Sequence, residues 1–159
     1  MNLSARDRMQ GPRAAEPEDV SDIHRLLKGH ADAGNLLPRP ARDIETNLAD
    51  FRVIDCGGKL AACAALELFP SSLGEIRSLA VLESYGRVGL GTMLVTEIID
   101  TARARGLTRL MALTYVPGFF HKFDFRTVPK ATLPEKVWGI CIKCYKFYDC
   151  DEIAVLLYL

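Results

Sequence analysis

A glycine-rich segment between a strand-like stretch and a helical stretch constrains the fold of this chain more than any other feature. Residues Glu75 to Val81 have a strand pattern, and apolar side chains recur at helical spacing from Leu90 to Ala102. Between them lie Gly86, Gly89 and Gly91, three glycines within six residues. Such a turn lets backbone N–H groups approach an anion, because the first-turn amides of a helix have no partner inside it. Spacing alone predicts a diphosphate-binding loop or a plain tight turn, and leaves both open.

The elements around this loop predict an α/β (α+β) chain with a mixed, mainly antiparallel central sheet and flanking helices. Helices are expected from Pro17 to about Lys28, at Ile44–Leu48, from Leu90 to Ala102 and at Phe119–Phe123. Strands are expected at Phe51–Cys56, Lys59–Phe69, Glu75–Val81, Arg109–Thr114, Phe125–Val128 and Ile153–Leu159. The order strand, helix, strand around the glycine loop implies a parallel crossover beside an antiparallel meander. We expect residues 1–159 to form a single domain, since a chain of this length fits one core.

Two other phosphate-binding patterns fit the loop poorly. A dinucleotide-binding fold places its glycines after the first strand of a repeated strand–helix series, whereas this loop follows a meander in mid-chain. A nucleotide-triphosphate loop needs Gly-Lys-Ser or Gly-Lys-Thr, which the sequence lacks.

Composition narrows the partners and the compartment. Apolar residues make up 49% and charged residues 25%, and twenty basic residues balance twenty acidic ones. Without a net positive field we expect neither nucleic acid nor an anionic membrane as a partner. No apolar run is long enough to span a membrane, and Met1–Gly11 lacks the apolar stretch of a secretory signal. The five cysteines are a poor disulfide framework, so a reducing cytoplasm is the expected location.

The loop resembles the glycine pattern of the GCN5-related N-acetyltransferases (GNAT), which bind acetyl-coenzyme A. Gly89 and Gly91 match its two small positions, whereas Gly86 stands where the pattern has Arg or Gln, and Arg87 lies one place late. Further segments resemble, in order, the short single-domain amino-acid N-acetyltransferases of arginine biosynthesis, the N-acetylglutamate synthase type. These segments are Leu36–Arg39, Gly74–Val81, Ala112–Pro117, Leu133–Trp138 and Asp151–Val155. The resemblance covers roughly residues 12–155 and implies a sheet whose parallel pair splays at an acetyl-CoA cleft.

This resemblance implies a cofactor site made mainly of backbone. N–H groups at Leu79, Ala80 and Val81 are expected to hold the pantetheine arm as an added strand, and one of them to polarise the thioester oxygen. The diphosphate is expected on the loop residues Gly86, Arg87, Val88, Gly89, Leu90, Gly91 and Thr92. No metal is expected in this chemistry.

Acetyl transfer to an amine needs a base for the ammonium and a proton for the departing thiolate. In the resembled synthases a glutamate at the strand position of Glu75 is the proposed base, and alternation places Glu75, Arg77 and Leu79 on one face. A plain ion pair between Glu75 and Arg77 on an exposed face is the alternative. Thr114 and Tyr115 are the candidate acids, with water as the alternative.

Two neighbouring residues make poor catalytic candidates. Phe120 stands where many relatives carry a tyrosine and has no proton to give. A lone His121 beside Lys122 is expected to be a surface residue.

An L-glutamate substrate brings two carboxylates, so its pocket needs at least two cations. Arg39, Arg77 and Lys136 fall in the shared segments and are the candidates, whereas glutamine would need only one of them. Taken singly, each is as well explained as an ordinary surface charge. Acetylation of another amine, such as glutamine, a polyamine or a protein N-terminus, stays open, as does a non-catalytic acetyl-CoA-binding module. A homodimer is also an open alternative.

Three cysteines cluster near the C-terminus, at Cys141, Cys144 and Cys150. Their spacing begins like a zinc site, but a structural zinc usually has four ligands. We therefore expect reduced structural thiols and keep zinc as the alternative.

Overall fold

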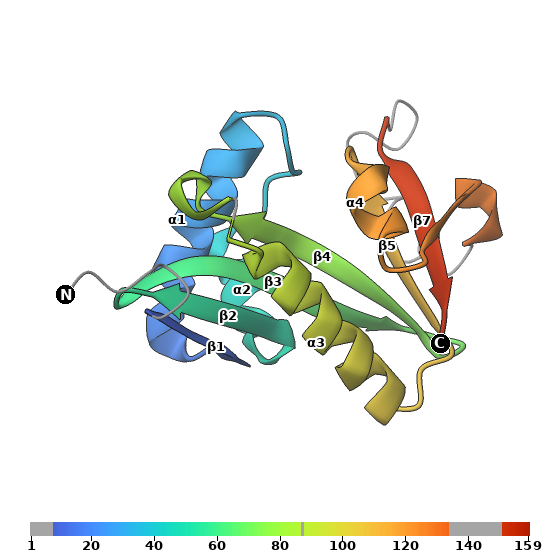
Figure 1. The fold of residues 1–159 in the computed structure, drawn as a ribbon, viewed down its shortest axis with the longest axis horizontal. Coiled ribbons are helices and arrows are strands. Elements are labelled where there is room, and N and C mark those ends of the chain that lie inside the picture. Colours follow the sequence, from blue (N-terminus) through green and yellow to red (C-terminus); the bar gives the residue numbers. More distant parts are fainter. Residues whose placement is uncertain (1–7, 87, 134–150) are drawn as a thin grey trace. The chain divides into compact units, whose positions relative to one another are not determined.

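A seven-stranded mixed sheet carries the fold (Figure 1). The computed structural model describes residues 8–86, 88–133 and 151–159. The strands are β1 (Met9–Ala14), β2 (Phe51–Cys56), β3 (Lys59–Phe69), β4 (Leu73–Val81), β5 (Arg109–Thr114), β6 (Arg126–Val128) and β7 (Ile153–Tyr158). They are hydrogen-bonded in the order β1-β2-β3-β4-β5-β7-β6. The α-helices are α1 (Val20–Asp32), α2 (Ala41–Thr46), α3 (Leu90–Ala104) and α4 (Pro117–His121).

Backbone contacts divide the chain into two compact units. The first contains Met1–Leu66 and Ser78–Ile98, and the second contains Glu67–Arg77 and Ile99–Leu159. The elements β3, β4 and α3 continue from one unit into the other along the chain.

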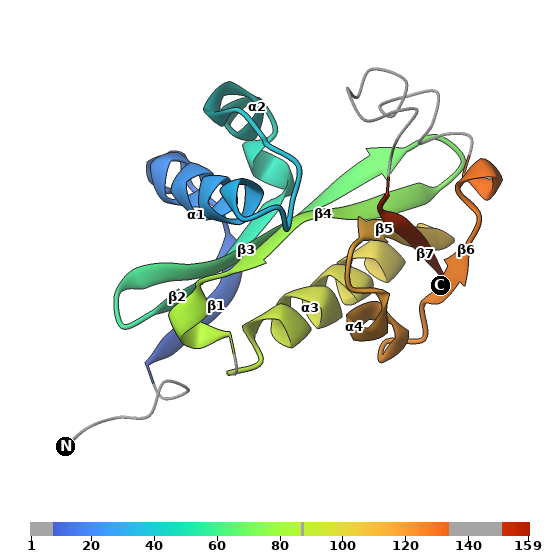
Figure 2. The ribbon, with the colours of Figure 1, turned by 90° about the horizontal axis from the view of Figure 1, so that it is seen from above.

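In the first unit, helices lie on both faces of the sheet. The hairpin of β2 and β3 turns at Gly57 and Gly58, whose φ angles of 60° and 78° favour glycine. Helices α1 and α2 lie on one side of the strands and the start of α3 lies on the other (Figure 2). β1 lies at the edge of the sheet and pairs antiparallel with β2.

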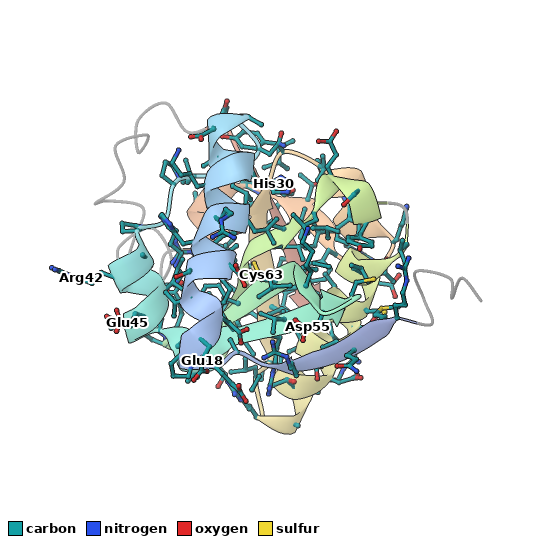
Figure 3. All side chains as sticks on the ribbon, turned by 90° about the vertical axis from the view of Figure 1, so that its left-hand side faces the viewer. Glu18, His30, Arg42, Glu45, Asp55 and Cys63 are labelled. Carbon is teal, nitrogen blue, oxygen red and sulfur yellow. The ribbon has the colours of Figure 1, made fainter. Side chains whose placement is uncertain are left out.

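The core of the first unit confirms the predicted amphipathic helix. Ile23 and Leu27 of α1 and Ile44 of α2 are buried in one cluster with Phe51 and Cys63 of the sheet. Figure 3 shows α1 in front of the strand that carries Cys63. The helical spacing read from the sequence therefore marks the buried face of α1.

The second unit contains the parallel pair that the sequence predicts. β4 pairs in parallel with β5 from Leu73↔Arg109 to Glu75↔Met111. β7 pairs antiparallel with both β5 and β6. Its core cluster contains Leu73, Met111, Leu133, Ala154 and Leu156.

Two short helices lie a few residues before their predicted positions. α2 begins at Ala41 directly after Pro40, and α4 begins at Pro117 rather than Phe119. Proline suits a helix start because its φ is fixed and its missing N–H would have had no partner there. The 3₁₀ helices are Pro17–Asp19, Leu48–Asp50, Glu83–Tyr85 and Lys130–Thr132. Within the described ranges, none of the helices has the length and apolar character needed to cross a bilayer.

Candidate functional site

Strand β4 bends at Ser78, where the cofactor-binding backbone is predicted to begin. Ser78 has a φ of 56°, in the left-handed region that residues with a side chain seldom adopt. This conformation breaks the strict alternation predicted for Glu75, Arg77 and Leu79, because alternation requires extended backbone throughout. Glu75 therefore precedes the bend, and Leu79 to Val81 follow it.

After the bend, alternate residues of β4 direct their backbone groups toward β3 and away from it. Leu82 N–H donates to Ala61 O at 2.8 Å, so Leu82 and, by alternation, Ala80 direct their backbone groups toward β3. Leu79 and Val81 direct theirs to the opposite edge. The described β4–β5 ladder ends at Glu75↔Met111, so no described strand pairs with that edge at Leu79 or Val81. An extended ligand can add there as a further strand.

His30 fixes the last carbonyl of this edge. Its Nε2 lies 2.8 Å from Val81 O. A carbonyl only accepts, so Nε2 carries the proton and Nδ1 can accept from Asn35 Nδ2, 3.4 Å away. His30 lies in the last turn of α1 (Figure 3). Among the described strands, none pairs with the N–H of Val81 or with the two backbone polar groups of Leu79 on this edge, so a ligand could bind them.

The backbone N–H groups of the glycine loop fall into two sets. One set is hydrogen-bonded inside the turn, and the other is available to an anion. Gly86 N–H donates to Glu83 O at 3.1 Å, and Val88 N–H donates to Tyr85 O at 3.2 Å. Since these two amides are engaged inside the turn, Gly86 and Val88 are weaker anion donors than the sequence predicted.

The other amides of the loop lie at the start of α3. Among described residues, the first helical hydrogen bond runs from Met93 N–H to Gly89 O at 3.1 Å. The N–H groups of Leu90, Gly91 and Thr92 precede it and lie in the first turn, where a helix provides no internal acceptor. Gly89 has a φ of 90°, and a side chain there would meet no atom of the described residues within 4 Å. Backbone conformation rather than space therefore calls for glycine at this position.

Glu75 is almost fully buried. Its side chain is 2% exposed, and its Oε1 lies 3.4 Å from Arg77 Nε. Arg77 Nη1 also donates to Glu67 Oε2 at 2.6 Å. The ion pair considered as an alternative is present, but Glu75 does not lie on an exposed face. Two carboxylates already offset the charge of Arg77, which is one of the three predicted substrate cations.

The two hydroxyl candidates at the end of β5 differ in how they are bonded. Thr114 is buried, and its oxygen accepts the N–H of Val116 at 2.9 Å. Within the described ranges its own proton has no acceptor, so Thr114 can donate it. Tyr115 instead donates to Asp151 Oδ1 at 2.9 Å, so its proton is already engaged.

Phe120 and His121 have the structural roles expected of them. Phe120 is buried, and its ring centroid lies 5.4 Å from that of Phe125. His121 is exposed, with Nε2 2.9 Å from Thr127 Oγ1.

Arg39 is a buried cation with one nitrogen unused. Its side chain is 6% exposed, and Nε lies 2.6 Å from Asp43 Oδ2. Nη1 donates to Ser78 Oγ at 3.0 Å, and the guanidinium lies 4.8 Å from the ring centroid of Phe51. In the part of the chain that the structure describes, Nη2 has no partner. Such a nitrogen is suited to a ligand carboxylate.

The remaining predicted residues, Arg87, Lys136, Cys141, Cys144 and Cys150, lie outside the described residues. Within the described ranges, no group of three His, Cys, Asp or Glu side chains could hold a metal ion.

Residues 20–125 match the acetyltransferase (GNAT) family, which is more than half of the chain. The chain belongs to this family. An uncharacterized N-acetyltransferase of Chlorobaculum tepidum is 35% identical over 144 residues, which are 91% of this chain and 93% of the relative. This GNAT chain therefore has the predicted family and fold.

Two other relatives are much longer than this GNAT chain. The amino-acid acetyltransferase of Neisseria meningitidis serogroup A is 35% identical over 125 residues, 77% of this chain and 29% of the relative. The N-acetylglutamate synthase of Neisseria gonorrhoeae, solved with coenzyme A and N-acetyl-glutamate, superimposes with a TM-score of 0.83 at 31% identity. That match covers 92% of this chain and 34% of the synthase. The chain thus spans about a third of these longer relatives.

Sequence reasoning did not predict three features of the site: the backbone conformation of Ser78, the partner of Glu67 and the contact of His30. Ser78 has no turn-forming neighbour to signal its backbone conformation, and Glu67 lies on another strand from the Arg77 it pairs with. His30 lies two residues beyond the predicted end of the first helix, which the structure extends to Asp32, and its acceptor is 51 residues away in the sequence.

Proposed function

We propose that this GNAT chain transfers the acetyl group of acetyl-CoA to the α-amine of an amino acid, with L-glutamate as the first candidate. Acetyl-CoA is the co-substrate that membership of the family implies. The observation that carries the amino-acid proposal is Arg39, a buried guanidinium whose Nη2 has no partner among described residues. Its segment, Leu36–Arg39, is one of those that resemble the N-acetylglutamate synthases.

The cofactor is proposed to bind by backbone groups of β4 and α3. The pantetheine arm adds to the edge formed by Leu79 and Val81. The diphosphate accepts hydrogen bonds from the first-turn amides of α3, where the helix dipole favours negative charge. The N–H of Leu79, directly after the bend, is the proposed donor to the thioester oxygen.

The proposed chemistry is a direct transfer without an acyl-enzyme. Glu75 takes a proton from the substrate ammonium, directly or through water, and the neutral nitrogen attacks the thioester carbonyl. The C–S bond then breaks. The nitrogen loses its second proton as the amide forms and the thiolate gains one, with Thr114 or water relaying the proton between them. Cys56 and Cys63 are buried in β2 and β3, which makes a covalent thiol intermediate a poor alternative.

L-Glutamine is the second candidate, and the environment of Arg77 favours it. Arg77 is paired with Glu67 and lies 3.4 Å from Glu75, so it has less charge to offer a second substrate carboxylate. A substrate with one carboxylate needs only Arg39. Lys136 is the cation that would restore a preference for glutamate.

Thiol release from acetyl-CoA, measured against a panel of amines, tests the proposal. The panel contains L-glutamate, L-glutamine, spermidine and a peptide with a free N-terminus. We expect turnover with glutamate, or with glutamine if Arg77 is unavailable to substrate. A preference for spermidine or the peptide would contradict the amino-acid assignment, and binding of CoA without turnover of any amine would indicate a non-catalytic module.

A further inference from the structure

Ser78 holds a left-handed conformation inside a strand, and its polar atoms are bonded on two sides. Its φ is 56°, and it is the last residue before the Leu79–Val81 edge. Its hydroxyl oxygen accepts from Arg39 Nη1 at 3.0 Å. Its carbonyl oxygen accepts from Cys63 Sγ at 3.4 Å. A residue that needs glycine-like backbone but carries a hydroxyl indicates a use for that hydroxyl.

Cys63 supports the carbonyl side of this arrangement. The thiol is fully buried in β3. Burial raises the pKa of the Cys63 thiol to about 12, so the sulfur keeps its proton at neutral pH and acts as a donor. This weak hydrogen bond fixes the carbonyl at the bend while leaving the hydroxyl to Arg39.

Arg39 makes an ion pair, a contact with an aromatic ring and a hydrogen bond to a hydroxyl. Asp43 pairs with Nε from the adjacent helix α2, and the Phe51 ring lies 4.8 Å from the guanidinium carbon. From β4, the hydroxyl of Ser78 accepts a hydrogen bond from Arg39 Nη1. The hydroxyl of Ser78 is therefore the direct link between the cation with an unused nitrogen and the bend that precedes the Leu79 amide.

We propose that Ser78 is a positioning residue that couples amino-acid binding to the cofactor strand. Its hydroxyl orients Arg39 so that Nη2 meets the substrate carboxylate, and its backbone aims the Leu79 N–H at the thioester oxygen. The inference rests on the function proposed above, because it assigns the carboxylate of that substrate to Arg39. Ser78 acts through Arg39 and does not itself touch the reacting atoms.

Two substitutions separate the hydroxyl from the backbone conformation. Ser78→Ala removes the hydroxyl but keeps a side chain, so the steric strain at positive φ remains. Ser78→Gly removes both the hydroxyl and the strain. We expect each to raise the KM for the amino acid about tenfold, the loss typical of a hydrogen bond to a charged group. The kcat and the affinity for CoA should change by less than about threefold. A role in backbone shape alone would leave the KM of Ser78→Gly unchanged.

Ser72→Gly is the matched control. Ser72 has the same φ of 56°, but it lies in the turn between β3 and β4. Relief of backbone strain at Ser72 should leave both the KM for the amino acid and the KM for acetyl-CoA unchanged. A rise in the amino-acid KM for this control would show that the assay reports stability rather than positioning.

A double variant tests whether Ser78 acts through Arg39. In an Arg39→Gln background, adding Ser78→Ala should change the amino-acid KM less than about twofold, since the partner of the hydroxyl is gone. A tenfold effect that persists in this background would overturn the inference, as would Ser78 variants with unchanged KM.

Each variant is first titrated with CoA by calorimetry. Loss of CoA binding in both Ser78 variants would also overturn the inference, because the hydroxyl would then serve the cofactor strand itself. Failure of the proposed function is seen separately, as a wild-type chain that acetylates no amino acid, and that result would overturn both.

Discussion

At the scale of single residues, Glu75 is the group on which the proposed proton transfer depends. It is 2% exposed, and its position is maintained on one side by Arg77. Glutamine has the same shape but cannot accept the ammonium proton at neutral pH. Glu75→Gln should therefore lower kcat about a hundredfold, as expected when a general base is lost. Stopped-flow thiol release measures kcat, and calorimetry should find CoA affinity nearly unchanged.

Glu67→Gln is the matched control for this prediction. Glu67 also pairs with Arg77, at 2.6 Å, but is not assigned a proton transfer. Its kcat should fall by less than about tenfold, because only the orientation of Arg77 is affected. Equal losses for the two variants would mean that Glu75 serves the ion pair rather than the chemistry.

The sequence predicted which residue types form the site, but not which hydrogen bonds they make. The sequence indicated Arg39 as a cation and Thr114 as a hydroxyl, but not that Nη2 of Arg39 has no partner among described residues or that Tyr115 donates to Asp151. Those facts depend on contacts between residues far apart in the sequence. Ser78 is the clearest case, since serine has no preference for positive φ and tertiary contacts set its conformation.

At the scale of elements, the loop before α3 depends on Gly89. Its φ of 90° is strained for any residue with a side chain, although a Cβ would have room. Gly89→Ala should cost about 1–2 kcal/mol in this conformation or shift the loop. If the loop carries the diphosphate, a shift should weaken CoA binding about tenfold or more, as measured by calorimetry.

Gly34→Ala and Gly86→Ala are controls for that experiment. Gly34 has a φ of 81° and open space around its Cβ position, but lies after α1, so its substitution has the same strain without the loop. Gly86 has a φ of −63°, which alanine adopts readily. Neither variant should change CoA affinity more than about twofold. A Gly34 variant that loses CoA as severely would show that stability rather than loop shape was being measured.

Arg13 joins three elements of the first unit. Its guanidinium donates to Asp19 Oδ2 at 2.8 Å in the 3₁₀ helix before α1, and to Asp55 Oδ2 at 2.8 Å in β2. The hydrogen bond from Arg13 holds the pKa of Asp19 below its usual value. A carboxylate with a lowered folded-state pKa stabilises the fold above its unfolded pKa of about 3.9, and that stability is lost as the pH falls through the folded value.

Asp19→Asn should therefore alter the acid side of the stability profile. At pH 7 the variant should lose about 1–2 kcal/mol of unfolding free energy, and the difference from wild type should shrink as the pH falls below about 4. Urea denaturation between pH 3 and pH 7 measures both. Asp22→Asn is the control, because the Asp22–Arg25 pair is exposed and should contribute little at any pH. A difference for Asp19→Asn that does not vary with pH would contradict the linkage.

Regular elements were predicted more closely than their ends. The span predicted for β5 agrees with the structure, because an apolar run bounded by turn residues marks a strand clearly. α2 and α4 were displaced by a few residues, since a helix of five or six residues shows less than two turns of periodicity. In both cases the proline at the start was the better guide.

At the scale of the whole molecule, the chain forms two compact units, and three of its elements have residues in both. β3, β4 and α3 each continue from one unit into the other, so separating the units would interrupt two strands and a helix. The order of elements from α1 onward was nevertheless predicted correctly, because each one shows its own periodicity in the sequence, and the order strand, helix, strand around the glycine loop implies a parallel crossover.

We therefore propose that residues 1–159 unfold as one N-acetyltransferase domain. Differential scanning calorimetry should give a single transition whose van't Hoff and calorimetric enthalpies agree. CoA at about a hundred times its Kd should move that whole transition upward by roughly 5–10 °C, because ligand binding stabilises everything that unfolds cooperatively with the site. Two transitions, of which CoA shifts only one, would mean that the units unfold independently and that the cofactor-binding loop and Glu75 belong to separate cooperative blocks.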